Sequence, residues 1–274
     1  MDYPIVFCDY DGTIFDPDAQ CVPARTLEAI HAYRKEGGIF VLTTGRIYSS
    51  IRPRAHAIGL DDGYLVCLQG SVGYEIDTGR QLFCHDLTVE EWHAVAEYAQ
   101  ARGWYFQIYH DTRFFVGRMN EYTREYADYC EVEPVEVGQP LGSWPEAQDW
   151  TSHKMIVMTP PEEAEERIAT LKRAFPTLDI SQSAPKYIEI VNAGSGKGNG
   201  IKAVCELLGI DVARSVAFGD ATNDNSMIIA AGVGVAMGNA LADTIAVADL
   251  VCAPVCQSGV ADVLDMIRAG KPLR

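Results

Sequence analysis

Short apolar runs alternate with amphipathic stretches along the first eighty residues. The runs at Ile5–Cys8, Ile39–Thr43 and Tyr64–Leu68 have the length and composition of buried strands. Between them, Pro23–Glu36 and Arg46–Ile58 have the spacing of helices, and the first of these has proline in its opening turn. A repeated strand-helix order of this kind predicts a parallel sheet covered by helices.

The same alternation returns in the last third of the chain. We expect helices at Lys197–Leu208, from Asp224, at Ala240–Val247 and at Gly259–Ala269, with strands at Ser215–Phe218, Val233–Ala236 and Leu250–Cys252. Residues 1–80 and 187–274 are therefore expected to form one α/β domain with a Rossmann-like parallel-sheet core.

The middle of the chain differs in amino-acid composition, since all four tryptophans fall between residues 92 and 150. Thr88-x-x-Glu91 is a capping box that predicts a helix to about Arg102. Beyond it the pattern predicts a hairpin at 104–117, helices at 120–130 and 161–175, and strands at 154–158, 178–183 and 187–191. We interpret residues 81–186 as an inserted α+β domain.

Composition and charge narrow the class of function. The 274 residues carry a net charge of −16 and no clustered basic segment, which argues against non-specific binding to nucleic acid or to an anionic membrane. No apolar run reaches the 18 residues typical of a membrane span, and the N-terminal segment lacks the features of a signal peptide. The eight cysteines are scattered without a zinc or redox spacing, so a reduced cytoplasmic location is expected.

Two carboxylates follow the first predicted strand. Asp9 and Asp11 stand at positions i and i+2, which points both side chains roughly the same way at the end of a parallel strand. Two carboxylates so close repel each other unless one is protonated or a cation lies between them. Hard oxygen ligands of this kind favour Mg²⁺, although a helix cap or a solvated turn would need no ion.

Other polar residues follow further strands of the same predicted sheet. Thr44 and Gly45 follow the second strand, where a hydroxyl and free backbone N–H groups at a helix start could hold an anion. Asp220 and Asp224 follow the strand at 215–218, although Asp224 could merely cap the next helix. Lys197 begins a helix, and together these groups predict a combined metal and phosphate site.

A phosphate-loop interpretation of the glycine-rich segment around Lys197 fails. A Walker loop needs glycine where Val191 stands and serine or threonine where Gly198 stands. The dinucleotide fingerprint fails as well, since the sixth residue is Asn199 or Ile201 according to the starting glycine.

The order of these motifs resembles that of the haloacid dehalogenase superfamily, and its Cof-type sugar phosphatase branch in particular. The chain contains D-x-D-G-T from Asp9, T-G-R from Thr44, G-x-G-K-G around Lys197 and G-D-x-x-N-D from Gly219. The resemblance continues through Gly238-Asn239-Ala240 and covers about residues 1–80 and 187–274. It implies that residues 81–186 form a cap that selects the substrate.

The resemblance implies a mechanism through an aspartyl-phosphate. Asp9 would be the nucleophile, and Asp11 would protonate the leaving alcohol and then activate water. Mg²⁺ would be held by Asp9, the backbone carbonyl of Asp11 and the side chain of Asp220, with Asp224 in support.

The same resemblance assigns the phosphoryl oxygens to Thr44, the Gly45 backbone, Lys197 and Asn223. Arg46 would either reach the substrate or hold Asp220 or a helix end. The turn Gln69-Gly70-Ser71 departs from the Asn-Gly-Ala that this branch often carries, which leaves its role open.

The predicted function is therefore a magnesium-dependent phosphatase of small phosphorylated metabolites, with sugar phosphates favoured, acting as a monomer. A phosphomutase would use the same nucleophile but pass the phosphoryl group to a sugar. A non-catalytic metabolite-binding protein on the same fold is the remaining alternative, and it is disfavoured because the predicted catalytic residues are all present.

Overall fold

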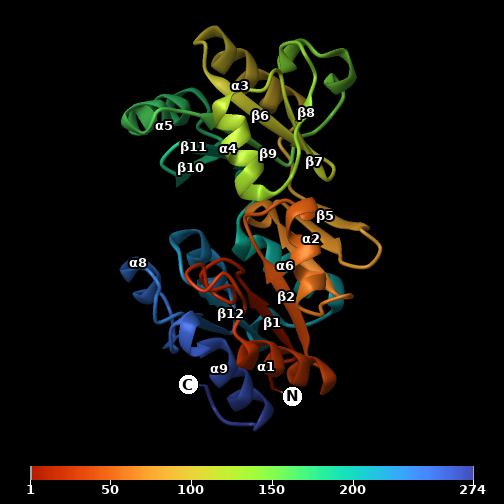
Figure 1. Ribbon diagram of the computed structural model, residues 1–274, viewed down its shortest axis with the longest axis vertical. Helices are drawn as coiled ribbons and strands as arrows, with labels where there is room; N and C mark the ends of the chain where they lie inside the picture. The colour runs from red at the N-terminus through yellow and green to blue at the C-terminus, as the bar shows by residue number, and fades with distance from the viewer. Residues whose placement is uncertain (1, 274) are drawn as a thin grey trace. The chain divides into compact units, whose positions relative to one another are not determined.

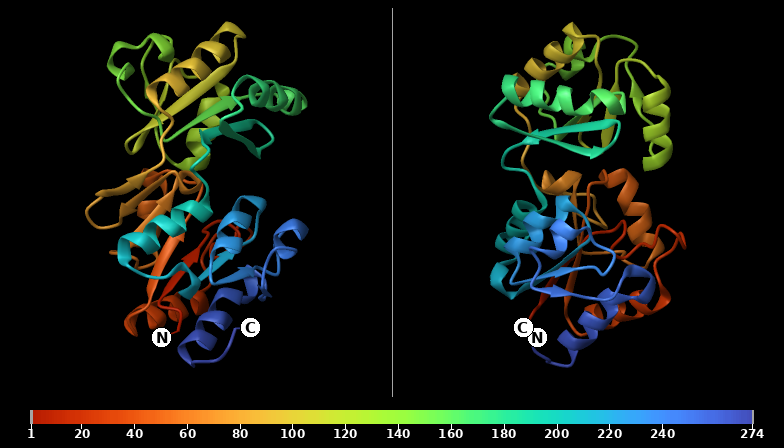
Figure 2. Two further views of the ribbon diagram at one scale, coloured as in Figure 1. Left: turned by 180° about the vertical axis from the view of Figure 1, so that it is seen from behind. Right: turned by 90° about the vertical axis from the view of Figure 1, so that its left-hand side faces the viewer.

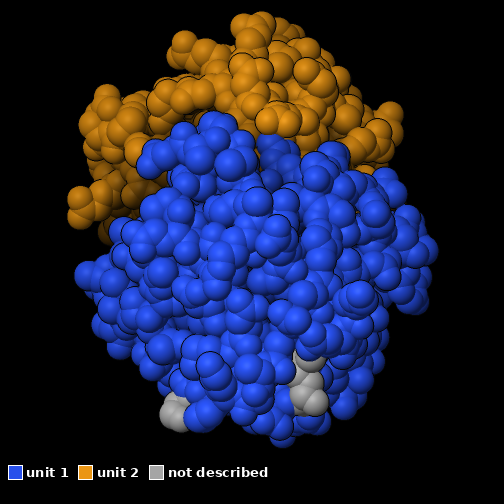
Figure 3. Space-filling view, turned by 60° about the horizontal axis from the view of Figure 1, so that its bottom comes forward, with its two compact units in different colours: residues 1–45, 51–83, 196–274 blue, residues 46–50, 84–195 orange. Residues whose placement is uncertain are grey.

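The chain divides into two compact units (Figure 3). A computed structural model describes residues 2–273. The first unit comprises Met1–Gly45, Ile51–Phe83 and Gly196–Arg274, and the second comprises Arg46–Ser50 and Cys84–Ser195.

An eight-stranded sheet runs through the first unit in the order β14-β13-β12-β1-β2-β3-β4-β5. Figure 1 labels four of its strands, β1, β2, β5 and β12. The strands from β14 to β3 are parallel, and β4 pairs antiparallel with β3. Their bounds are β1 Ile5–Cys8, β2 Ile39–Thr43, β3 Tyr64–Cys67, β4 Val72–Glu75, β5 Gln81–Cys84, β12 Ser215–Gly219, β13 Val233–Ala236 and β14 Leu250–Val251.

Helices cover both faces of this sheet, with α1 packed on α9 and α6 packed on α7 (Figure 2). Ile5 and Phe7 of β1 share an apolar core with Ile201 and Val204 of α6, so Val6 and Cys8 alternate towards the other face. The helical bounds are α1 Ala24–Lys35, α2 Tyr48–Ala57, α6 Lys197–Leu208, α7 Asn225–Ala230, α8 Ala242–Ile245 and α9 Gly259–Arg268, with short 3₁₀ turns η1 Leu68–Gly70, η5 Val212–Arg214, η6 Thr222–Asp224 and η7 Val255–Gln257.

The second unit is built on a six-stranded sheet in the order β10-β11-β9-β6-β7-β8. Its core gathers Trp92 of α3 with Phe106, Ile108 and Met155 of the sheet. The bounds are α3 Val89–Ala101, β6 Tyr105–His110, β7 Arg113–Val116, α4 Glu121–Cys130, β8 Val135–Glu136, η2 Leu141–Ser143, η3 Pro145–Ala147, β9 Lys154–Met158, η4 Pro161–Glu163, α5 Ala164–Ala174, β10 Leu178–Ala184 and β11 Tyr187–Asn192.

The α/β class with a parallel-sheet core is confirmed, but the predicted domain boundaries need correction. The strand at Tyr187–Asn192 belongs to the second unit, because it pairs antiparallel with both β9 and β10. Arg46–Ser50 also groups with the second unit, where the Ser50 hydroxyl donates to the Cys130 carbonyl at 2.6 Å.

The alternation did not reveal β4 and β5, which extend the first sheet beyond β3. Both strands are only four residues long, and β4 contains a glycine, so neither has a clear apolar pattern. Within residues 2–273, no helix is both long enough and apolar enough to span a membrane.

Candidate active site

The site begins at the carboxyl end of β1, which lies between β2 and β12 in the sheet. The backbone N–H of Asp9 donates to the carbonyl of Phe218 at 3.0 Å, which ties the ends of β1 and β12 together. Asp9 continues the alternation of Ile5 and Phe7, and these two side chains face α6. The carboxylate of Asp9 is therefore directed towards the side of the sheet where α6 begins.

Lys197 is the first residue of α6, and its side chain is fully buried. Its Nζ lies 2.6 Å from Asp9 Oδ1 and 2.5 Å from Asp224 Oδ1. The other oxygen of Asp224 accepts the backbone N–H groups of Asp220 at 2.9 Å and Ala221 at 3.0 Å. Both oxygens of Asp224 are thus engaged, so this residue holds Lys197 and the loop that carries Asp220.

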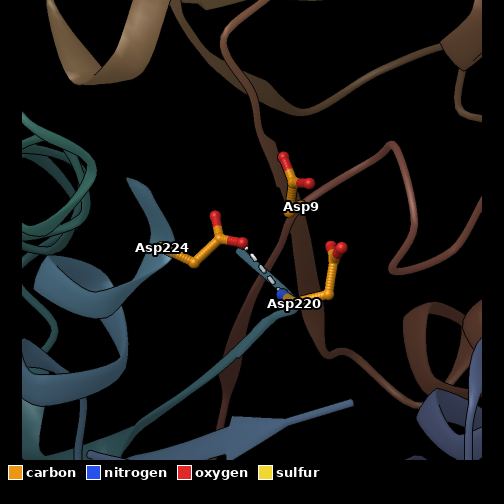
Figure 4. A group of neighbouring side chains, drawn as sticks. All are labelled: Asp9, Asp220 and Asp224. Atoms are coloured by element: carbon orange, nitrogen blue, oxygen red, sulfur yellow. Dashed lines mark hydrogen bonds between the residues drawn. The ribbon is translucent and has the colours of Figure 1, made fainter. Parts of the chain in front are cut away.

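Three carboxylates converge at this point from two strand ends and one turn (Figure 4). Asp9, Asp220 and Asp224 each offer an oxygen, and these oxygens lie within 4.8 Å of one another. Asp220 Oδ1 also accepts the hydroxyl of Thr13 at 2.7 Å. Within residues 2–273, Lys197 is the ammonium bonded to this group, so the four side chains have a formal excess of two negative charges when all are ionised.

Burial and the neighbouring charges shift the pKa values of the groups in this cluster. Burial raises the pKa of Asp9, and the Asp224 charge adds to this while Lys197 opposes it. Burial also raises the pKa of Asp220 to about 6, against the hydrogen bond from Thr13. The pKa of Lys197 is raised because the charges of Asp224 and Asp9 outweigh its burial. Burial and mutual repulsion therefore oppose ionisation of these carboxylates, and a bound cation would offset both effects.

Gly12 brings the loop after β1 close to Asp220. Its φ is +78°, and a Cβ at this position would stand 2.5 Å from Asp220 Oδ2. The Gly12 carbonyl also accepts the side-chain amide of Asn239 at 2.8 Å. Only glycine satisfies both the backbone conformation and the close approach of the carboxylate.

Thr44 and Gly45 follow β2, and Asn223 follows β12 on the other side of β1. Gln69, which follows β3, contacts both segments. Thr44 is buried, and its backbone N–H donates to the Val66 carbonyl at 2.8 Å. The carboxamide nitrogen of Gln69 lies over Gly45, 2.6 Å from where a Cβ would stand. The amide of Asn223 donates to Gln69 Oε1 at 3.0 Å.

The structure brings together Asp9, Lys197, Asp220 and Asp224 as the motifs suggested. Asp11 lies near enough for its charge to raise the pKa of Asp220, but its carboxylate is outside the three-carboxylate cluster. Arg46 belongs to the second unit, where its guanidinium lies 5.1 Å from the Tyr129 ring centroid and 3.3 Å from Ser50 Oγ. Its expected roles towards substrate and towards Asp220 stay predictions.

Three contributors were not singled out from the sequence. Thr13 lies in the D-x-D-G-T motif and Asn239 in Gly238-Asn239-Ala240, and these motifs are the sequence signal for both contacts. Gln69 was noticed only as a departure, since its contact with Asn223 joins residues 154 positions apart.

A family model of haloacid dehalogenase-like hydrolases matches residues 6–264. The chain belongs to this family. An HMP-PP phosphatase of Serratia proteamaculans (strain 568) is 29% identical over 244 residues, which cover 87% of this chain and 85% of the relative. A Bacillus subtilis (strain 168) relative named 5-amino-6-(5-phospho-D-ribitylamino)uracil phosphatase YcsE is 26% identical over 267 residues, covering 96% and 95%.

Among solved structures, the HAD subclass IIB sugar phosphatase BT4131 superposes with a TM-score of 0.80. It is 25% identical, and the match covers 97% of this chain and 98% of that one. The resemblance to the Cof-type branch that the motifs indicated is thereby confirmed. The chain is an enzyme, a phosphatase of the haloacid dehalogenase family.

Proposed function

We propose that the protein is a magnesium-dependent phosphatase of small phosphorylated metabolites that works through an aspartyl-phosphate on Asp9. The observation that carries this proposal is the buried arrangement in which Lys197 bridges Asp9 and Asp224 beside Asp220. An ammonium and a cluster of carboxylates at one sheet edge suit a phosphoryl group that must be held and attacked.

The donor set fits Mg²⁺. Its atoms are hard carboxylate oxygens, and the excess of two negative charges matches a divalent cation. Asp9 and Asp220 would hold the ion together with the backbone carbonyl of Asp11, while Asp224 stays engaged with Lys197 and two backbone N–H groups. When bound, the ion would neutralise charge on the nucleophile and on the phosphoryl oxygens.

Asp9 would attack phosphorus through a carboxylate oxygen, forming a new O–P bond as the ester O–P bond breaks. Lys197 holds Oδ1 of Asp9 and so orients its carboxylate for this attack. The carboxyl of Asp11 would give its proton to the departing alkoxide. The Asp11 carboxylate would then take a proton from water as that water attacks phosphorus, which releases phosphate and restores Asp9.

Positioning of the phosphoryl oxygens falls to residues from three segments. Thr44, the Gly45 backbone, Lys197 and Asn223 would donate hydrogen bonds to these oxygens, which carry the charge in the transition state. The ammonium is preorganised, because its burial and two carboxylate partners leave it little freedom to move.

The substrate class proposed here is the sugar phosphates. The name of the Bacillus subtilis relative specifies a phosphorylated ribityl chain, and the solved structure is named a sugar phosphatase. The second unit, inserted between the halves of the first, would serve as the cap that selects the leaving group. A panel of sugar phosphates, nucleotides and cofactor phosphates, read by phosphate release, tests this class, and a preference for nucleotides would contradict it.

The central test measures release of inorganic phosphate from p-nitrophenyl phosphate with Mg²⁺. Turnover should disappear in the Asp9→Asn variant and in wild-type protein treated with EDTA, and Mg²⁺ should restore the latter. Mass spectrometry after an acid quench should find a phosphoryl adduct on the peptide that carries Asp9.

Asp243→Asn is the matched control, since Asp243 is an exposed aspartate in the first unit outside the cluster. It should keep wild-type turnover. Unchanged turnover in Asp9→Asn would refute the nucleophile assignment. In the panel of sugar phosphates, appearance of a second phosphorylated sugar without free phosphate would replace hydrolysis by phosphoryl transfer to a sugar.

A further inference from the structure

The turn that follows β3 has an unusual backbone. Leu68, Gln69 and Gly70 all have positive φ, at 51°, 61° and 91°. Left-handed conformations are uncommon for residues other than glycine, and asparagine, aspartate and histidine are the usual exceptions. Two consecutive non-glycine residues in this region cost free energy that contacts elsewhere must offset, and such strain concentrates at functional sites.

This turn contacts the three segments that carry the proposed phosphate-binding groups. The Gln69 backbone N–H donates to the Thr44 carbonyl at 3.1 Å, and its carboxamide lies over Gly45. Gly70 packs so closely on the backbone of Gly196, just before Lys197, that a Cβ would collide with it. The third contact is the hydrogen bond from Asn223 to Gln69 Oε1.

We propose that Gln69 is a positioning residue that holds the Asn223 carboxamide towards the phosphate-binding loop at Thr44 and Gly45. The proposal rests on the phosphatase function above and assigns a role to a side chain that no motif identified. Asn223 is exposed and follows β12, so its side chain would otherwise sample several rotamers. A fixed acceptor at Gln69 Oε1 reduces that freedom before substrate arrives, which favours phosphate binding.

The strained turn explains how a residue after β3 reaches a residue after β12, because β1 and β2 lie between these strands in the sheet. The left-handed conformation turns the chain back over Gly45 and directs the Gln69 side chain along the sheet edge. A glycine at position 69 would relieve the strain but would remove the acceptor. Stability and activity should therefore respond in opposite directions to that change.

The test is a double-mutant cycle on Gln69→Ala and Asn223→Ala, with p-nitrophenyl phosphate as substrate and inorganic phosphate as inhibitor. A hydrogen bond between neutral groups predicts that Gln69→Ala lowers kcat/KM and weakens phosphate inhibition roughly fivefold. Asn223→Ala also removes the proposed phosphate donor and should lower both quantities at least as much. The double variant should lose no more than Asn223→Ala alone, because Gln69 acts only through Asn223. If the fold-losses in kcat/KM of the two single variants multiply in the double variant, or if neither single variant changes kcat/KM, the proposal is overturned.

Gln69→Gly separates positioning from a merely structural role. It should raise the melting temperature while it lowers kcat/KM as much as Gln69→Ala does, whereas a lower melting temperature would contradict stored strain at this turn. Gln20→Gly is the reference for strain relief, since Gln20 is an exposed glutamine with φ of 53°. Gln81→Ala is the kinetic control, because Gln81 is exposed on β5 and should leave turnover unchanged.

The outcomes also separate this proposal from the function on which it rests. Wild-type protein that releases no phosphate from any ester would overturn the phosphatase mechanism on Asp9. Wild-type protein that is active, with Asp9→Asn inactive and no coupling between Gln69 and Asn223, would overturn only the role of Gln69.

Discussion

Replacement of Lys197 by methionine should destabilise the first unit strongly and lower turnover at least 100-fold. The methionine side chain is similar in length to that of lysine but is apolar. The substitution therefore removes the ammonium without opening a large cavity. It leaves Asp224, which is fully buried, and Asp9, which is 8% exposed, without their shared counter-ion. Removal of one partner from a buried ion pair costs about 3–5 kcal/mol, so the free energy of unfolding should fall by roughly that amount in EDTA.

The assay must follow the two units separately. All four tryptophans, at positions 92, 104, 144 and 150, lie in the second unit, so their fluorescence reports that unit alone. Amide hydrogen exchange of β1 and α6 peptides reports the first unit. Lys197→Met should accelerate exchange in those peptides and leave the tryptophan transition unchanged.

Two further variants sharpen this prediction. The Lys197→Met/Asp224→Asn double variant removes one of the two buried carboxylates left without a counter-ion. It should regain part of the lost stability without regaining activity. Lys202→Met on the same helix is the control, because Lys202 is exposed and should change neither quantity. Turnover should drop at least 100-fold in Lys197→Met, the usual loss on removing a preorganised donor. Exchange rates equal to those of the wild type would refute the argument that Lys197 neutralises a buried cluster.

Three other predictions concern the cluster and the second unit. Gly12→Ala places a Cβ against Asp220 and should raise the Mg²⁺ concentration for half-maximal turnover at least tenfold, whereas an unchanged Mg²⁺ titration would show that the loop can shift. Thr13→Val removes the 2.7 Å hydrogen bond to Asp220 and should raise the same midpoint roughly fivefold, with Thr13→Ser as the control that retains the hydroxyl. Burial raises the pKa of Asp86, but the hydrogen bond and charge of His153, 2.7 Å away, outweigh it and lower that pKa. The Asp86 carboxylate therefore stabilises the second unit above its ordinary pKa of about 3.9, and this stabilisation is lost as the pH falls through the lowered value. Tryptophan-monitored unfolding of Asp86→Asn should differ from the wild type at pH 7 and converge with it in acid; a constant difference across this range would contradict the assignment.

Local patterns determined much of the fold. The strands Ile5–Cys8, Ile39–Thr43, Lys154–Met158 and Val233–Ala236 were predicted with the bounds that the structure has, as was the helix Lys197–Leu208. Ile5–Cys8, Ile39–Thr43 and Val233–Ala236 are buried strands of a parallel sheet, which are continuous apolar runs, and Lys154–Met158 is an equally buried strand in the centre of the second unit's sheet. A helix that follows a glycine-rich turn has a clear start, so each of these signals is contained in a few neighbouring residues. The capping box at Thr88 and Glu91 is present for the same reason.

The candidate site was predictable to the extent that strand ends define it. Asp9, Asp220 and Lys197 stood at the ends of predicted elements, and the carboxyl ends of parallel strands share one edge of a sheet. Which of these groups touch was not predictable from position alone. The engagement of Asp224 with Lys197, and of Thr13 with Asp220, depends on the placement of β12 directly beside β1.

The amino-acid sequence by itself determined the alternating elements, the acidic strand ends and the family to which they belong. Only the tertiary structure decided that Tyr187–Asn192 completes the second unit's sheet, that Gln69 meets Asn223, and that Gly12 leaves room for Asp220. The physical reason is that periodicity and capping act over a few residues, whereas these contacts join segments up to 208 residues apart through strand pairing and close packing.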